Sequence, residues 1–349
     1  RRVPPAGGRA TVRASTKGGM MMRPAWMLLL VPAVPLIQAA APPVAQVAPA
    51  TQDAALNAFL DAAFDAQVAL SPEMQTHLGL KTNYDRLDDY TDALSVRRMA
   101  LAEQQLKDMR ARFRPEQLSD SARVSYRLFE SETERARDSF QFRKLRFPVS
   151  TNGSPAGSIP VLLINNHRVE TVADARAYIA RLRDTERVMR EVAATMREQA
   201  AAGIVPNKVN FAPARADAQK VITGAPFDTG ADSTLMADFA KKVAALDAPA
   251  ATKDTLLADA QAALTGPFRR GYGVLLAALD AIEPQSKGNF GAWSLPDGAA
   301  YYADRLKNST TTDMTADQVH ALGLAQVAAI RKEMEAVKQQ VGFTGTLEQ

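Results

Sequence analysis

The sequence predicts an all-α fold, a large multi-helix array with one irregular, loop-rich segment near residues 148–170. Apolar residues recur at helical spacings of three and four along most of residues 53–349. Hydrophobic residues make up 46% of the chain and aromatic residues only 6%, a balance that favours helix packing over a β-sandwich. The irregular segment stands out because Gly, Pro and Asn clusters surround a single short apolar run.

The first 52 residues are predicted to be processing and linker sequence. Residues 1–19 precede the first methionines and are interpreted as an extension upstream of the native start. Residues 20–41 have the positive charge, short apolar core and small residues of a secretory signal peptide, and residues 42–52 form a Pro/Ala linker. A retained N-terminal membrane anchor is the alternative, but the core is short and contains Pro32 and Pro35. We therefore expect a periplasmic or secreted protein without a stable membrane span in its mature form.

The charge distribution argues against a nucleic-acid partner. The formal net charge is +4, but residues 1–23 contain six basic residues and no acidic one. Removing these six charges leaves −2 for residues 24–349. Because a nucleic-acid-binding domain needs a basic surface, we expect no nucleic acid to bind.

The domain begins with a succession of predicted helices. The segment 53–68 places its apolar side chains near one face. Ser71 followed by Pro72 is a typical helix start, and a third helix is expected over 91–113. A fourth begins at Ser119 or Ser121 and runs to about residue 142.

The middle of the domain contains the clearest predicted helix. It begins at the capping residue Thr171 and ends at Gly203, with Pro206 enforcing the stop. Its arginines alternate with acidic residues, which indicates a solvated face. Further helices are predicted over 233–246, 251–264 and 266–283.

The last predicted helix carries the histidine of greatest interest. Thr315 and Gln318 form a capping box, and Gly342 is a plausible C-terminal stop. The apolar stripe of this helix, followed backward, reaches Gly323 and then His320, so we expect His320 on the packing face. A glycine on that face suggests that another backbone or a ligand approaches closely.

Few residues of this chain are suited to metal binding. There is no cysteine, and His77, His167 and His320 are far apart in the sequence. A zinc-binding histidine pair on one helix face, with a glutamate as base, is absent. We therefore predict no metal ligand and no catalytic residue in this chain. A Ser-His-Asp triad stays open because triads assemble from distant positions, although no Gly-x-Ser-x-Gly turn exists.

Residues 291–334 carry a family resemblance. They read GAWSLPDGAAYYADRLKNSTTTDMTADQVHALGLAQVAAIRKEM, with a Leu-Pro-Asp-Gly turn, tyrosines, a threonine run and a Val-His-x-x-Gly-Leu helix in that order. This order resembles the bacterial family called domain of unknown function 885. The resemblance extends from about Asp53 to Gln349.

The resemblance implies a mostly helical, metallopeptidase-like hydrolase that acts on peptides outside the cytoplasm. The metal-binding stretch of such proteins, of the type His-Glu-x-x-Pro-Gly-His, is expected beyond Gln349. Residues 53–349 would then be the N-terminal helical part, incomplete at its C-terminus and inactive alone, with zinc expected in the full-length protein.

Five residues are predicted to line the substrate cleft of that larger enzyme: His320, Tyr301, Tyr302, Asp297 and Gly323. A histidine or tyrosine there is suited to donate a hydrogen bond to the substrate carbonyl or its developing oxyanion. The main alternative is a non-catalytic helical module that binds peptides or envelope partners. A lipid- or envelope-associated structural protein is a further alternative.

Overall fold

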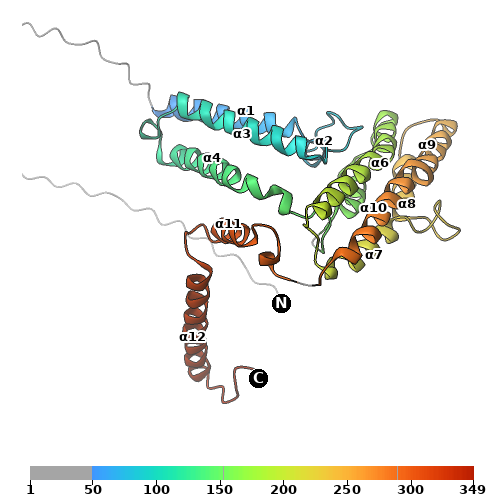
Figure 1. Cartoon of the computed structure of the whole chain (residues 1–349). Coiled ribbons are helices and arrows are strands. Elements are labelled where there is room, and N and C mark those ends of the chain that lie inside the picture. The colour runs from blue at the N-terminus through green and yellow to red at the C-terminus, as the bar shows by residue number, and fades with distance from the viewer. Residues whose placement is uncertain (1–48, 152, 289) are drawn as a thin grey trace, which may run out of the picture. The chain divides into compact units, whose positions relative to one another are not determined.

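The computed structural model describes residues 49–349 apart from residues 152 and 289, and these residues form helices without a β-strand (Figure 1). The all-α prediction is therefore confirmed. The predicted upstream extension and signal peptide lie outside the described residues. The helices, in chain order, are α1 (Pro49–Val68), α2 (Pro72–His77), α3 (Asp92–Arg112), α4 (Asp120–Ser139), α5 (Pro155–Asn165), α6 (Val172–Ala201), α7 (Phe211–Val221), α8 (Thr234–Ala244), α9 (Ala250–Ala263), α10 (Arg269–Ile282), α11 (Gly298–Thr310) and α12 (Ala316–Gln340).

Helices α1, α3 and α4 pack side by side around a small core (Figure 1). Leu56, Leu106 and Met109 are among its buried residues, at 0–4% exposure. Each fully buried Leu or Met side chain contributes about 1.5–3 kcal/mol relative to an exposed one. A 3₁₀ helix, η2 (Phe140–Leu145), continues α4 and leads into the second part of the domain.

Helix α6 is the centre of a larger core that it forms with α5 and α7 to α10. Tyr178, Leu182 and Met189 of α6 are fully buried, at helical spacings. The start of α6 has the predicted cap: the Thr171 side chain accepts a hydrogen bond from the Asp174 N–H, and Asp174 accepts one from the Thr171 N–H.

The predicted irregular segment near 148–170 contains one helix, α5. Pro155 occupies the first turn, where its missing N–H is not needed, and Ile159 and Leu163 are fully buried against the larger core. The buried Tyr272 hydroxyl donates a hydrogen bond of 2.5 Å to the Ala156 carbonyl. The residues around α5 are irregular, as predicted.

The crossing of α10 over α6 depends on Gly271. A Cβ at this position would stand 2.9 Å from the Cα of Glu186 and 3.2 Å from the carbonyl oxygen of Thr185. Both neighbours are backbone atoms, which cannot move aside as the end of a flexible side chain can. We expect Gly271→Ala to lower the free energy of unfolding by about 1–3 kcal/mol.

Gly273, in the same helix, is the matched control for this prediction. A Cβ there meets nothing within 4 Å, so Gly273→Ala should raise stability by up to about 1 kcal/mol through helix propensity. Urea unfolding followed by circular dichroism measures both variants. Equal stabilities for the two would contradict a close helix crossing at Gly271.

Helix α12 differs from the others because none of its residues is buried. Its capping box at Thr315 and Gln318 is formed as predicted, and Gly342 adopts a φ of 72° just beyond its end. The predicted apolar stripe is present but exposed, with Val327, Ile330 and Met334 between 47% and 57% accessible. Within residues 49–349, excepting 152 and 289, no helix has both the length and the hydropathy to cross a membrane.

Candidate functional site: an arginine-lined pocket

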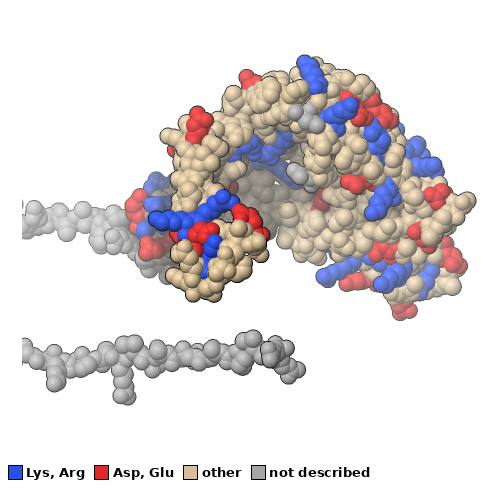
Figure 2. Space-filling view, turned by 90° about the horizontal axis from the view of Figure 1, so that it is seen from below, with Lys and Arg blue, Asp and Glu red and all other residues tan. Residues whose placement is uncertain are grey.

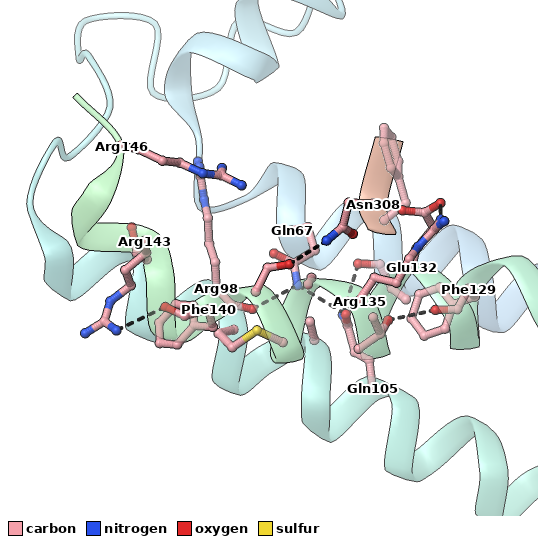
Figure 3. A pocket seen from close by; sticks show the side chains of 18 of the residues that line it. Gln67, Arg98, Gln105, Phe129, Glu132, Arg135, Phe140, Arg143, Arg146 and Asn308 are labelled. Carbon is pink, nitrogen blue, oxygen red and sulfur yellow. Dashed lines mark hydrogen bonds and ion pairs between the residues drawn. The ribbon is translucent and has the colours of Figure 1, made fainter. Parts of the chain in front are cut away.

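A cavity of about 720 Å³ lies where α1, α3, α4, η2 and α11 meet, and we call it the arginine pocket (Figure 3). This volume is in the range of about 300–1,000 Å³ that is typical of small-molecule sites. Apolar side chains from four of these elements form its floor: Leu60, Phe64, Met99, Phe129 and Phe140. The amide groups of Gln67 and Asn308 line the same cavity. It therefore offers apolar surface together with polar groups that can orient a ligand.

Five arginines and one glutamate line this cavity, so positive charge predominates among its lining side chains. The arginines are Arg98, Arg135, Arg143, Arg146 and Arg305. Figure 2 shows Lys and Arg side chains inside the hollow of the face seen from below. Low-dielectric walls strengthen the field of such charges, so the pocket favours an anionic ligand.

Four of the five arginines are held by a carboxylate of the protein. The pairs are Arg98 with Asp88, Arg135 with Glu132, Arg143 with Asp92 and Arg305 with Asp304. The Arg143 pair is bidentate, at 2.7 and 3.0 Å, and it holds the pKa of Asp92 below its usual value. Figure 3 shows the Arg143 side chain with its hydrogen bond of 3.2 Å to the Phe140 carbonyl oxygen.

Arg146 differs from these four. Among the residues that the structure describes, no carboxylate lies within ion-pairing distance of its guanidinium group. Its backbone is held by α6, since the Gln199 side chain of that helix donates hydrogen bonds of 2.8 Å to the carbonyl oxygens of both Lys144 and Arg146. The fold thus holds the Arg146 backbone in place and leaves its charge available to a ligand.

A second cavity, of about 470 Å³, adjoins the first at Arg146, which lines both. Its wall includes Phe147, Phe290, Leu295 and Tyr301, so it is partly apolar as well. The Tyr301 ring lies 5.9 Å from the ring of Phe142, and the guanidinium of Arg305 lies 5.7 Å from the Tyr301 ring. An extended ligand that occupies both cavities would pass Arg146.

A buried polar cluster ties α6 to the segment that precedes α3. Arg181 of α6 is 0% exposed, and its guanidinium donates to the carbonyl oxygens of Arg86 at 2.8 Å and Pro72 at 3.2 Å. It also donates to the Thr76 hydroxyl at 2.6 Å and to Nδ1 of His167 at 3.2 Å. This buried charge is therefore satisfied by neutral acceptors, and no carboxylate of the described residues is in direct contact with it.

His167 is neutral in this cluster, in a single tautomer. Its Nδ1 must accept because an arginine only donates, so Nε2 carries the hydrogen and donates to the Asp174 carbonyl at 3.1 Å. The ring stacks on Tyr84 with 3.9 Å between centroids. Burial, and then the positive charge of Arg181, lower the pKa of His167 to about 3.

The predicted cleft residues fall into two groups. Asp297, Tyr301 and Tyr302 lie at the start of α11, where Asp297 has a left-handed φ of 53°. Tyr301 lines the second cavity, whereas Tyr302 is 52% exposed. His320 and Gly323 lie on the exposed helix α12 instead, and a Cβ at Gly323 would meet nothing within 4 Å outside the helix's own backbone.

The structure thus does not bring His320 and Gly323 into contact with the α11 group among the described residues. The expectation that a packed neighbour approaches Gly323 is not met there, because no described residue covers the apolar stripe of α12. A role of these two residues in substrate binding stays a prediction.

Sequence reasoning missed both the arginine pocket and the buried Arg181. Arg181 was expected on a solvated face of α6, and the structure corrects this. Its position has a signal in the sequence: it lies three residues after Tyr178 and four before Thr185, both of which are fully buried. The pocket arginines have no comparable signal, because Arg98 and Arg305 come from helices far in sequence from residues 135–146, which hold the other three.

No three histidine or carboxylate side chains of residues 49–349, with 152 and 289 left aside, are grouped so that they could hold a metal ion. The described residues therefore do not fit a zinc site, and no zinc-dependent step is assigned to them.

Comparison with known proteins identifies the family. A profile described as bacterial protein of unknown function (DUF885) matches residues 72–349. A solved structure of the putative lipoprotein from Colwellia psychrerythraea is similar, with a TM-score of 0.68 and 21% sequence identity over 86% of this chain and 53% of that chain. This likeness shows the fold, and this chain spans about half the length of that protein. A comparison with curated proteins found no match. The chain belongs to the family of bacterial proteins of unknown function (DUF885).

Proposed function

We propose that this chain is the N-terminal helical part of a secreted or periplasmic zinc-metallopeptidase-like hydrolase and that its arginine pocket binds the peptide substrate. One observation carries the proposal: a single cavity combines an apolar floor with an arginine wall. Peptides present apolar side chains and polar backbone groups together, and the floor and the amides of Gln67 and Asn308 match both. The zinc of such a hydrolase would be held by residues other than those described above.

A non-catalytic peptide-binding module would use the same pocket. The two functions share the binding step and differ only in whether hydrolysis follows. The order of turn, tyrosines, threonine run and histidine helix in residues 291–334 favours the hydrolase.

Binding and hydrolysis are tested separately on the purified chain. Fluorescent peptides with apolar side chains are titrated and followed by anisotropy, and the same mixtures are analysed by mass spectrometry with and without added zinc. We expect saturable binding that unlabelled peptide reverses, and no cleavage by this chain. A failure to bind any peptide would contradict the proposal, as would stoichiometric zinc together with cleavage.

His320 provides a further prediction about the hydrolase. In a form of the protein with measurable peptide hydrolysis, His320→Ala should lower turnover about 100-fold if the imidazole donates to the developing oxyanion. The free energy of unfolding should change by less than about 0.5 kcal/mol, because the helix that carries His320 has no buried residue. Unchanged turnover at unchanged stability would remove His320 from the site.

A further inference from the structure

We infer that Arg146 is the anchor for a carboxylate of the bound peptide, with apolar groups of that peptide occupying the cavities on its two sides. This inference rests on the proposed peptide binding and adds the chemical class of ligand. It begins from the position of Arg146, which lines both the arginine pocket and the second cavity.

The charge of the site indicates a ligand with one negative charge. Four of the pocket arginines already have a carboxylate partner, and Arg146 alone has none among the described residues. One guanidinium neutralises one carboxylate in a bidentate pair. A phosphate monoester carries about two negative charges and would keep an excess charge in a partly apolar cavity, at a desolvation cost.

Arg98 supplies a second donor on the same cavity wall. Its bond to Asp88 is long, at 3.3 Å, and Asp88 is already engaged by the Ser71 hydroxyl at 2.6 Å and the Glu73 N–H at 3.0 Å. The guanidinium of Arg98 is therefore the pocket arginine that is least tightly held by its own partner. Arg98 can therefore offer an N–H donor to a carboxylate at Arg146 while its charge stays paired with Asp88.

Each of the two cavities that Arg146 lines has apolar side chains in its wall. Phe140 and Met99 line the arginine pocket, while Phe147 and Leu295 line the second cavity. A free carboxylate between two apolar side chains, or at the end of a peptide with an apolar last residue, matches this arrangement. An acidic side chain within the peptide supplies the same chemistry from another source.

Three synthetic peptides distinguish these sources: acetyl-Ala-Ala-Leu-Phe as the free acid, its C-terminal amide, and the amide in which the second alanine is glutamate. Affinities are measured by isothermal titration calorimetry on the purified chain. We expect the free acid to bind about 10- to 100-fold more tightly than the neutral amide. If the glutamate amide binds more tightly than the neutral amide, the anchored carboxylate belongs to a side chain. This result would still support an anchor at Arg146.

The variants Arg146→Gln and Lys144→Gln test the residue itself. Both remove one exposed positive charge from the same segment, but Lys144 lines neither cavity. Both keep the carbonyl groups that Gln199 binds, so the fold should be unaffected. We expect Arg146→Gln to abolish the difference between acid and amide, Arg146→Lys to retain part of it, and Lys144→Gln to preserve it.

The outcomes distinguish a failure of the carboxylate anchor from a failure of peptide binding. If the wild-type chain binds acid and amides equally, peptide binding stands and the carboxylate anchor is wrong. If Arg146→Gln and Lys144→Gln weaken acid binding equally, the effect is general electrostatics and the anchor is again wrong. If no peptide binds, the proposed function itself fails.

Discussion

Arg181→Met is expected to lower the free energy of unfolding by about 3–5 kcal/mol. The substitution removes a fully buried guanidinium and its hydrogen bonds to the carbonyl groups of Arg86 and Pro72, the Thr76 hydroxyl and Nδ1 of His167. The Pro72 carbonyl keeps the Thr76 hydroxyl as a donor, and the other three acceptors lose the donor that Arg181 supplied. Each unsatisfied buried group costs about 1–3 kcal/mol, while release of the buried charge offsets part of the total. The substitution should also loosen the segment 72–91 from α6.

Arg183→Met, two residues further along α6, is the matched control. The Arg183 side chain is 53% exposed and lies 3.8 Å from Asp259, so its removal should change stability by less than about 0.5 kcal/mol. Both variants are measured by urea unfolding followed by circular dichroism. If Arg181→Met is as stable as Arg183→Met, the buried cluster does not hold α6 and the segment 72–91 together.

The stability of the protein should fall with decreasing pH below about 6.5 because His167 is buried in its neutral form. Its pKa is about 3 in the folded state and 6.5 in an unfolded chain. Between these values the unfolded state binds one more proton, so stability rises with pH at about 1.4 kcal/mol per unit at most. Between pH 7.5 and 5.0 the loss should be about 2 kcal/mol.

Above pH 5 the histidine is separated from the carboxylates whose folded pKa is lowered, whereas Glu73, whose pKa burial raises, would oppose part of the loss because its protonation favours the folded state. Asp92, Asp174 and Glu186 have folded pKa values below their usual 3.8 to 4.5, so the stability they add is lost only at lower pH. His167→Asn is the control, since its Oδ1 takes the place of Nδ1 and does not titrate. It should be less stable at pH 7.5 and nearly independent of pH between 7.5 and 5.0. An equal pH dependence in both proteins would assign the effect to other groups.

Much of the fold could be predicted from local patterns. The capping boxes at Thr171 and Thr315 are formed where expected, because a cap depends only on residues three apart. Helix α1 begins at Pro49, inside the predicted linker over 42–52, since a proline is tolerated in the first turn of a helix. The packing of α10 on α6 at Gly271 was not predicted, because it depends on the backbone of a helix about 85 residues earlier.

Little of the candidate site could be predicted. Arg98, Arg146 and Arg305 line one cavity only after α3, the residue that follows η2 and α11 have been brought together, and no spacing in the sequence indicates this. The environment of Arg181 was misread for a related reason. Alternating charges on α6 indicate a solvated face, but the acceptors of Arg181 come from residues 72–86, which cover this part of the helix.

The most direct test of the account is to locate a bound peptide on the protein. A peptide that carries a photoreactive benzoylphenylalanine beside a free C-terminal carboxylate is irradiated with the purified chain, and the cross-linked residues are identified by mass spectrometry. We predict cross-links within 60–67, 95–105, 129–147 and 290–308, which line the two cavities and which an excess of unlabelled peptide protects. Suppressible cross-links confined to other segments, such as α12, would contradict it.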